Sequence, residues 1–215
     1  MEDFFRTILV IIVSIFNGFL NLLPLLLFVL YMLFMFVLIS LVSFLLIVII
    51  AFAIANIIAK SSYLKLRQKC LYGDYDFVIS KGPKLVTWYS FVSKMLPLSN
   101  ARKIIDALNI FLAISFLSKD NSEKFLYYIN RVNKNVDHKE FWISIYYLLQ
   151  KNVKLAEDHY KNLCESKTPQ EDMICFLDAM FLYETGNPEQ AREKMNMVHS
   201  KLNYKFTQEI AHKII

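Results

Sequence analysis

Residues that make turns and crosslinks are scarce in this chain of 215 residues. Four glycines and five prolines are too few for a collagen or a flexible linker protein, and they argue against a β-sandwich, which needs many turns. The three cysteines, Cys70, Cys164 and Cys175, are too few and too scattered for a disulfide framework. Charged residues make up 20% of the chain and hydrophobic residues 56%, compared with roughly 25% and 45–50% in an average globular protein. The composition therefore excludes a disordered chain.

Charge is absent from one long N-terminal stretch. Residues 7–59 contain no Asp, Glu, Lys, Arg or His, and a helix needs only about 20 apolar residues to cross a membrane. The stretch is several times longer than the apolar core of a cleaved signal peptide, which has roughly 7–15 residues. Its only cluster of turn formers lies in residues 17–24, which include an Asn-Gly pair and a proline. We therefore expect a two-helix transmembrane hairpin in residues 1–59, with a turn nearer Tyr31 or a single span with a re-entrant start as alternatives.

Basic residues follow the apolar stretch directly. Four of them lie within ten residues, namely Lys60, Lys65, Arg67 and Lys69. Residues 60–103 carry a net charge of +7, whereas residues 1–6 and 104–215 each carry −1. Because positive segments beside a span prefer the cytoplasmic side, we expect a multi-pass protein of the cell (inner) membrane with a cytoplasmic soluble domain. The four basic residues are expected to contact anionic lipid headgroups. Nucleic-acid binding, the other interpretation of a basic segment, has no supporting motif.

The remaining residues carry helix start signals and no long alternation of the kind that strands show. Four segments combine a capping residue with the first turn of a helix: Ser99-Asn100, Asn121-Ser122-Glu123, Thr168-Pro169-Gln170-Glu171 and Asn187-Pro188-Glu189. We therefore expect an all-α fold. Residues 60–98 would form a basic juxtamembrane neck with a first helix pair, and residues 99–215 a domain of helical repeats.

Two windows of the chain match at an offset of 35 residues. The offset aligns Ser144 with Ala179, Tyr147 with Leu182, Lys151 with Gly186, Ala156 with Ala191 and Tyr160 with Met195. Small residues at such positions let two helices cross closely. An earlier copy has Phe125 where the crossing alanine would be, and the phrase from Leu71 to Val78 is a trace of another.

This pattern resembles the tetratricopeptide repeat, a helix–turn–helix unit of about 34 residues. The resemblance implies an α-solenoid of three to four helix pairs over roughly residues 65–205, with a concave face that binds a peptide or a helix. The positions that match this face are apolar: Phe141, Ile145, Leu148, Phe176, Met180 and Tyr183. The alternative is that a neighbouring helix already covers them.

Sequence signatures of catalysis and of metal binding are missing. The four histidines, at 138, 159, 199 and 212, are isolated, no C-x-x-C occurs, and neither a phosphate-binding glycine loop nor a nucleophile elbow is found. The polar residues of the apolar stretch do not ionise, which argues against a transporter. We therefore expect no catalytic residue, no metal and no cofactor, and a protein that is not an enzyme.

A membrane hairpin followed by tetratricopeptide-like repeats is similar in layout to the HemY family of bacterial inner-membrane proteins. The short hairpin and short array of this chain limit that likeness to architecture. The function that we expect is a scaffold or adaptor that binds a protein partner at the cytoplasmic face of the membrane. The alternative is a non-catalytic accessory subunit of a larger membrane complex, with other membrane-protein subunits as partners.

Overall fold

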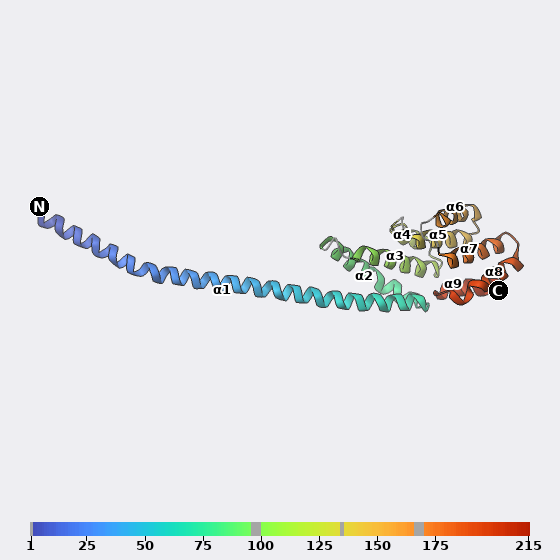
Figure 1. Ribbon diagram of the computed structural model, residues 1–215, viewed down its shortest axis with the longest axis horizontal. Helices are drawn as coiled ribbons and strands as arrows, with labels where there is room; N and C mark the ends of the chain where they lie inside the picture. Colours follow the sequence, from blue (N-terminus) through green and yellow to red (C-terminus); the bar gives the residue numbers. More distant parts are fainter. Residues whose placement is uncertain (1, 96–99, 134–135, 166–169) are drawn as a thin grey trace. The chain divides into compact units, whose positions relative to one another are not determined.

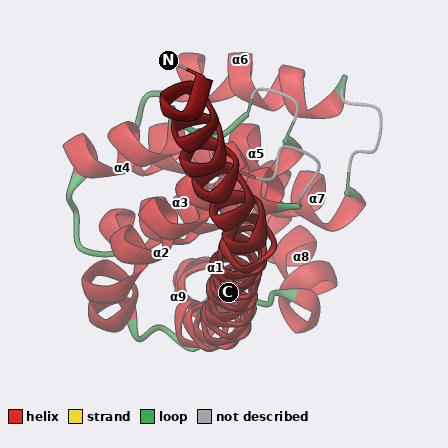
Figure 2. Cartoon of the chain, turned by 90° about the vertical axis from the view of Figure 1, so that its left-hand side faces the viewer, coloured by secondary structure: helices red, strands yellow, loops and turns green. Residues whose placement is uncertain are grey.

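The structure is a computed structural model that describes residues 2–95, 100–133, 136–165 and 170–215. All regular elements within these ranges are helices (Figure 2). The chain divides into two compact units, residues 1–57 and residues 58–215, and each is described by itself. The expected all-α fold is therefore confirmed for the described residues. The boundary between the units falls two residues before the predicted end of the membrane segment at residue 59.

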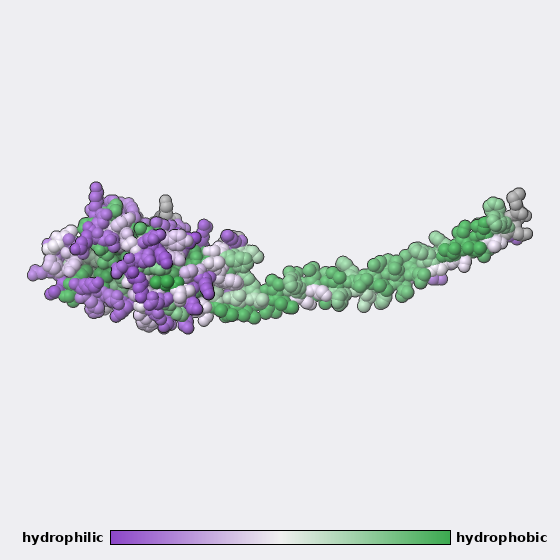
Figure 3. Space-filling view, turned by 180° about the vertical axis from the view of Figure 1, so that it is seen from behind, coloured by the Kyte–Doolittle hydropathy of each residue, from purple (hydrophilic) through white to green (hydrophobic). Residues whose placement is uncertain are grey.

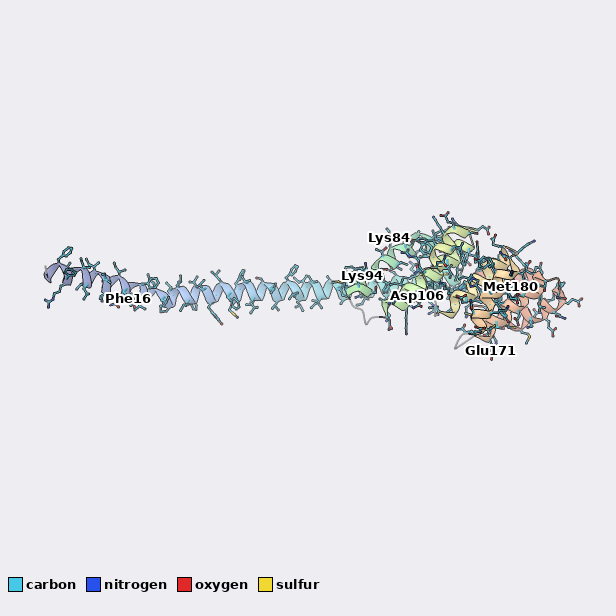
Figure 4. The ribbon with its side chains drawn as sticks, turned by 90° about the horizontal axis from the view of Figure 1, so that it is seen from above. Phe16, Lys84, Lys94, Asp106, Glu171 and Met180 are labelled. Atoms are coloured by element: carbon cyan, nitrogen blue, oxygen red, sulfur yellow. The ribbon has the colours of Figure 1, made fainter. Side chains whose placement is uncertain are left out.

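The first unit consists of the N-terminal part of α1 (Glu2–Leu71), and its apolar side chains point outward. Figure 3 shows hydrophobic residues along this segment, with few polar ones between them. Phe16, labelled in Figure 4, has 61% of its surface exposed. Among the described residues, α1 is the one helix that is long and apolar enough, over Phe4–Leu71, to cross a membrane.

The structure does not show the predicted hairpin turn, because residues 17–24 continue the helix and Pro24 lies inside it. A proline inside a helix removes one backbone hydrogen bond, here the one to the carbonyl of Leu20. Leucine and phenylalanine dominate the surrounding sequence, and leucine is a strong helix former. Five residues lie between Gly18 and Pro24, so the two helix breakers do not act at one place.

The second unit consists of consecutive helix pairs. The end of α1, residues 58–71, precedes α2 (Tyr75–Met95), and the later pairs are α3 (Ala101–Leu117) with α4 (Ser122–Ile129), α5 (Asp137–Leu149) with α6 (Val153–Cys164), and α7 (Glu171–Glu184) with α8 (Pro188–Val198). A short 3-10 helix, η1 (His199–Lys201), and α9 (Lys205–Ile214) complete the unit (Figure 1). The expected caps at Ser99 and Thr168-Pro169 lie outside the described residues.

The two helices of each pair are joined by the same turn. In each turn one residue adopts a positive φ; in chain order these residues are Gly73, Asp120, Lys151 and Gly186. The next residue is Asp or Asn, and its N–H donates to the carbonyl five residues earlier at 2.8–2.9 Å in all four turns. This is the hydrogen bond of the Schellman motif, which ends a helix with a left-handed residue. The last two turns lie 35 residues apart, the offset found in the sequence, and the middle two lie 31 apart.

The small residues expected at the helix crossings are buried. Ala156 and Ala191 have none of their surface exposed. The Ser144 hydroxyl donates to the carbonyl of Ala156 at 3.4 Å, which places α5 directly against α6 at this point. In the α3–α4 pair the equivalent residue is Phe125, which is also fully buried and stacks on Tyr146 with ring centroids 4.8 Å apart. The larger side chain therefore fills a space between neighbouring pairs.

The C-terminal helix α9 packs back toward earlier elements. Trp142 of α5 meets Tyr204 with ring centroids 5.2 Å apart. A Cβ added to Gly73 would lie 3.0 Å from the Lys205 side chain, so the start of α9 touches the first turn of the unit. Thr207, Ile210, Ala211 and Ile214 form the buried face of α9. This helix covers part of the surface formed by the first helices of the pairs.

Candidate functional site

Five of the six residues predicted to line a concave binding face are buried. Phe141 and Met180 are 4% exposed, and Ile145, Leu148 and Phe176 are not exposed at all. Figure 4 labels Met180 among the packed side chains of the second unit. Only Tyr183, at 43%, meets solvent. Neighbouring helices cover most of the surface of these five side chains, as the alternative interpretation of the sequence proposed.

Two of these residues nevertheless form the base of a cavity. Phe141 and Phe176 lie with ring centroids 5.8 Å apart and line a hollow of about 410 Å³. The rest of its wall comes from the end of α1, the starts of α5 and α7, η1, α9 and the segment between η1 and α9. It consists of Arg67, Leu71, His138, Gln170, Asp172, Met173, Lys201, Leu202, Asn203, Tyr204 and Thr207. The cavity thus has an aromatic base and a rim that carries charge of both signs.

The rim charges have defined neighbours. Lys201 and Asp172 form an ion pair at 2.7 Å, and the hydrogen bond from Lys201 to this carboxylate raises the pKa of the lysine. Burial raises the pKa of Tyr204, and the nearby positive charge of Arg67 partly opposes that increase. Arg67 is exposed. A ligand with both an apolar and an anionic group would therefore find matching contacts here.

The four residues predicted to contact lipid headgroups lie in different surroundings. Lys65 lies over the Phe77 ring at 5.5 Å, and Lys69 pairs with Asp74 at 2.9 Å. Arg67 lines the cavity, and Lys60 is exposed. Because a helix rises about 1.5 Å per residue, the four span about 13 Å of α1, whereas each headgroup layer is only about 5–8 Å thick. Of the four, Lys60 is the best placed to contact a lipid headgroup, because it directly follows the apolar stretch.

Other ionisable groups join neighbouring helices. The Nδ1 atom of His159 lies 2.6 Å from the carboxylate of Glu140, which lowers the pKa of Glu140. The Tyr160 hydroxyl donates to Asp178 at 2.5 Å, and the Lys194 ammonium donates to the same carboxylate at 2.6 Å. Asp178 therefore connects α6, α7 and α8, beside a second hollow of about 590 Å³ between these helices. These contacts stabilise the packing of consecutive pairs.

The part of the chain that the structure describes holds no group of three His, Cys, Asp or Glu side chains placed to bind a metal ion. Its three cysteines are free. Cys70 is buried, and burial raises the pKa of its thiol to about 12. Cys164 is exposed.

The sequence interpretation missed the contribution of η1 and α9 to the cavity. Leu202, Tyr204 and Thr207 come from this C-terminal segment. The apolar spacing of Phe206, Ile210, Ala211 and Ile214 is the signal that predicts α9 as an amphipathic helix. It does not predict where that helix packs.

Comparison with known proteins gives one family. The family model described as "Uncharacterised Treponema protein" matches residues 97–213. No curated protein and no solved structure matches the chain, and the tetratricopeptide and HemY resemblances have no support from these comparisons. Because the family match covers more than half of the 215 residues, the chain belongs to this uncharacterised Treponema protein family.

Proposed function

We propose that the chain is a membrane-anchored, non-catalytic adaptor that holds a protein partner at the cytoplasmic face of the cell membrane. The observation that carries this proposal is the continuation of a charge-free apolar helix into a unit of paired helices. Side chains such as Phe16, Phe28 and Phe44 are each about 60% exposed on α1. An apolar surface of this extent is compatible with lipid or with other apolar spans, and not with water.

The length of the apolar segment supports two crossings. Residues 7–59 would extend about 80 Å as one helix at roughly 1.5 Å per residue, whereas the hydrocarbon core of a bilayer is about 30 Å thick. A single crossing would leave about 30 of these residues outside the hydrocarbon. A return turn at residues 17–24, adopted when the chain enters a membrane, would place most of these 30 or so residues in a second crossing. It would also put both ends of the apolar segment on the cytoplasmic side.

Cysteine labelling distinguishes one crossing from two. A membrane-impermeant maleimide is added to intact cells that carry either Gly18→Cys or Phe4→Cys. With two crossings, the cysteine at residue 18 reacts and the cysteine at residue 4 reacts only after the membrane is permeabilised. With one crossing, both react in intact cells, and the hairpin is then wrong.

The cytoplasmic orientation rests on the basic residues that follow the apolar segment. Cys164 is exposed in the second unit and serves as a natural reporter of its side. We expect Cys164 to resist the impermeant maleimide in intact cells and to react after permeabilisation. A Cys164→Ser control identifies the labelled residue, and reaction in intact cells would contradict the orientation.

The proposed partner site is the cavity based on Phe141 and Phe176. Its mixed rim suits a peptide segment with apolar and acidic side chains, because Arg67 is exposed at the edge. A photo-crosslinking residue at Gln170, on the rim, should give a discrete protein adduct in cells, and one at Gln190, outside this cavity, should not. Arg67→Glu should abolish the adduct without changing the amount of protein. An adduct that is unaffected by Arg67→Glu would contradict this site.

The second candidate function is a subunit of a larger membrane complex. The observation that favours it is the apolar surface of α1, which other spans would cover. Purification in mild detergent distinguishes the subunit from the adaptor. A stable partner of fixed stoichiometry with many spans, retained in Arg67→Glu, favours the subunit. A partner that Arg67→Glu releases favours the adaptor.

A further inference from the structure

One face of α2 changes from polar to apolar toward the end of the helix. Lys84, Trp88, Phe91 and Met95 are spaced by four, three and four residues, so they form one stripe along the helix. Phe91 is 48% exposed and Met95 63%. The Trp88 and Phe91 rings lie next to each other, with centroids 6.0 Å apart. Phe91 and Met95 therefore lie outside the core of the second unit, next to the half-buried ring of Trp88.

Contacts with α1 give the direction of this stripe. Phe77, near the start of α2, lies under the ammonium groups of Lys65 and Lys69 at 5.5 and 5.9 Å. Burial raises the pKa of Tyr89, near the end of α2, and the electrostatic influence of Tyr63 on α1 adds to that increase. Between these two contacts α2 advances twelve residues while α1 runs back by two to six, so the helices run in opposite senses at an inclined angle, and α2 runs toward the level of Lys60.

The apolar cluster reaches that level. Met95 lies six residues beyond Tyr89 on α2, and Lys60 lies three residues beyond Tyr63 on α1, so both lie on the same side of the contact between the two tyrosines. Lys60 is the first charged residue after the apolar stretch. It therefore marks the level at which α1 leaves the hydrocarbon of a bilayer.

The charges beside the stripe favour an anionic surface. From Phe77 to Met95, α2 contains three lysines and no acidic residue. Figure 4 labels two of the lysines, Lys84 and Lys94. A basic amphipathic helix with tryptophan and phenylalanine on its apolar side is typical of helices that lie at the membrane surface. Each basic group near an anionic bilayer contributes about 1 kcal/mol.

We propose that the end of α2 inserts Trp88, Phe91 and Met95 into the interfacial layer of the bilayer that α1 enters, with Lys84 and Lys94 at the headgroups. This inference rests on the membrane anchoring proposed above and deepens it. With α1 and α2 both in contact with the bilayer, the second unit is held against the surface instead of pivoting on one helix.

Fluorescence quenching by brominated lipid tests the contact. The full chain is placed in nanodiscs of phosphatidylcholine and phosphatidylglycerol, with or without bromine near the glycerol end of the acyl chains. The chain has two tryptophans, and Trp142 is 1% exposed. We expect bromine to remove about half of the wild-type emission, because tryptophans at the bilayer interface meet the quencher. Trp88→Phe, which retains only Trp142, should lose almost none.

A tryptophan in α1 separates failure of this inference from failure of the anchor. Phe16→Trp in the Trp88→Phe background should be quenched by lipid brominated near the chain end. If this residue is quenched and bromine lowers the wild-type emission by no larger a fraction than it lowers the emission of Trp88→Phe, the α2 contact is wrong and the anchor stands. That outcome would indicate that a second copy of the chain or another protein, and not lipid, covers the α2 stripe. If neither residue is quenched, both proposals are wrong.

Discussion

The left-handed residues of the turns make a direct test of the helix-pair architecture. Lys151 and Gly186 occupy equivalent turns, with φ of 56° and 86°. An L-residue in this conformation costs roughly 1–2 kcal/mol, and glycine avoids that cost. The exchange Lys151→Gly should therefore stabilise the second unit, and Gly186→Ala should destabilise it. No atom lies within 4 Å of a Cβ added at Gly186, so the effect there is conformational and not steric.

The expected magnitude follows from two opposing contributions. Relief of the left-handed conformation contributes roughly 1–2 kcal/mol, and the greater freedom of glycine in the unfolded chain opposes it by about 0.5–1 kcal/mol. The net change in the free energy of unfolding is therefore about 0.5–1 kcal/mol. It is an increase for Lys151→Gly and a decrease for Gly186→Ala. In a unit of this size, 1 kcal/mol shifts the melting temperature by about 2–4 °C.

Thermal unfolding of the full chain in detergent, followed by helical circular dichroism, measures both shifts. Arg192→Gly is the matched control, because Arg192 is exposed inside α8 and glycine there should cost about 1 kcal/mol. A control that melts lower while Lys151→Gly melts higher supports the turn assignment. The reasoning is refuted if Lys151→Gly also melts lower, since residue 151 would then not need a left-handed conformation.

Three further predictions use the same protein. Ala156→Leu should lower the free energy of unfolding by about 1–3 kcal/mol, because Ala156 is fully buried at a helix crossing. The control is Glu157→Leu at the neighbouring exposed position, which should change the free energy of unfolding by less than about 0.5 kcal/mol in the same melts. The lowered pKa of Glu140, caused by His159, gives stability that is present above the unfolded pKa of about 4.3 and is lost as pH falls through the lower folded pKa. Glu140→Gln should therefore melt below wild type near neutral pH and approach it in acid, and a constant difference would contradict this link. Maleimide should modify Cys164 in the folded chain and Cys70 only after denaturation, because Cys70 is buried with a thiol pKa of about 12; equal rates by mass spectrometry would contradict its burial.

The helical architecture could be predicted because its signals are local. Asn121, Asn152 and Asn187 each follow a left-handed residue and cap the next helix. Each turn is therefore encoded by a few adjacent residues. The small residues at the crossings repeat at a fixed offset for a similar reason, since each pair is one local unit. The predicted turn at residues 17–24 lacks such a signal, because Gly18 and Pro24 are separated by residues that continue a helix.

The candidate site could be predicted only in part, because it depends on contacts that are distant in the sequence. The tetratricopeptide resemblance placed Phe176 and Met180 on one apolar face, and it could not show which neighbour covers that face. The cavity combines Arg67 of α1 with Tyr204, more than 130 residues later. No pattern within either segment points to the other.

The packing of α9 limits how a partner can bind. Ile210 and Ile214 are buried on α9, and exposing two such side chains costs roughly 3–6 kcal/mol. A peptide that displaced α9 to reach the whole face of the first helices would therefore bind roughly 10² to 10⁴ times more weakly than the same contacts would otherwise allow. A segment that enters the cavity beside Tyr204 leaves α9 in place and avoids this cost. The partner contacts should accordingly concentrate in this cavity and at its rim, where Arg67 and Lys201 lie, and Ile145, Leu148 and Met180 should affect binding only through stability.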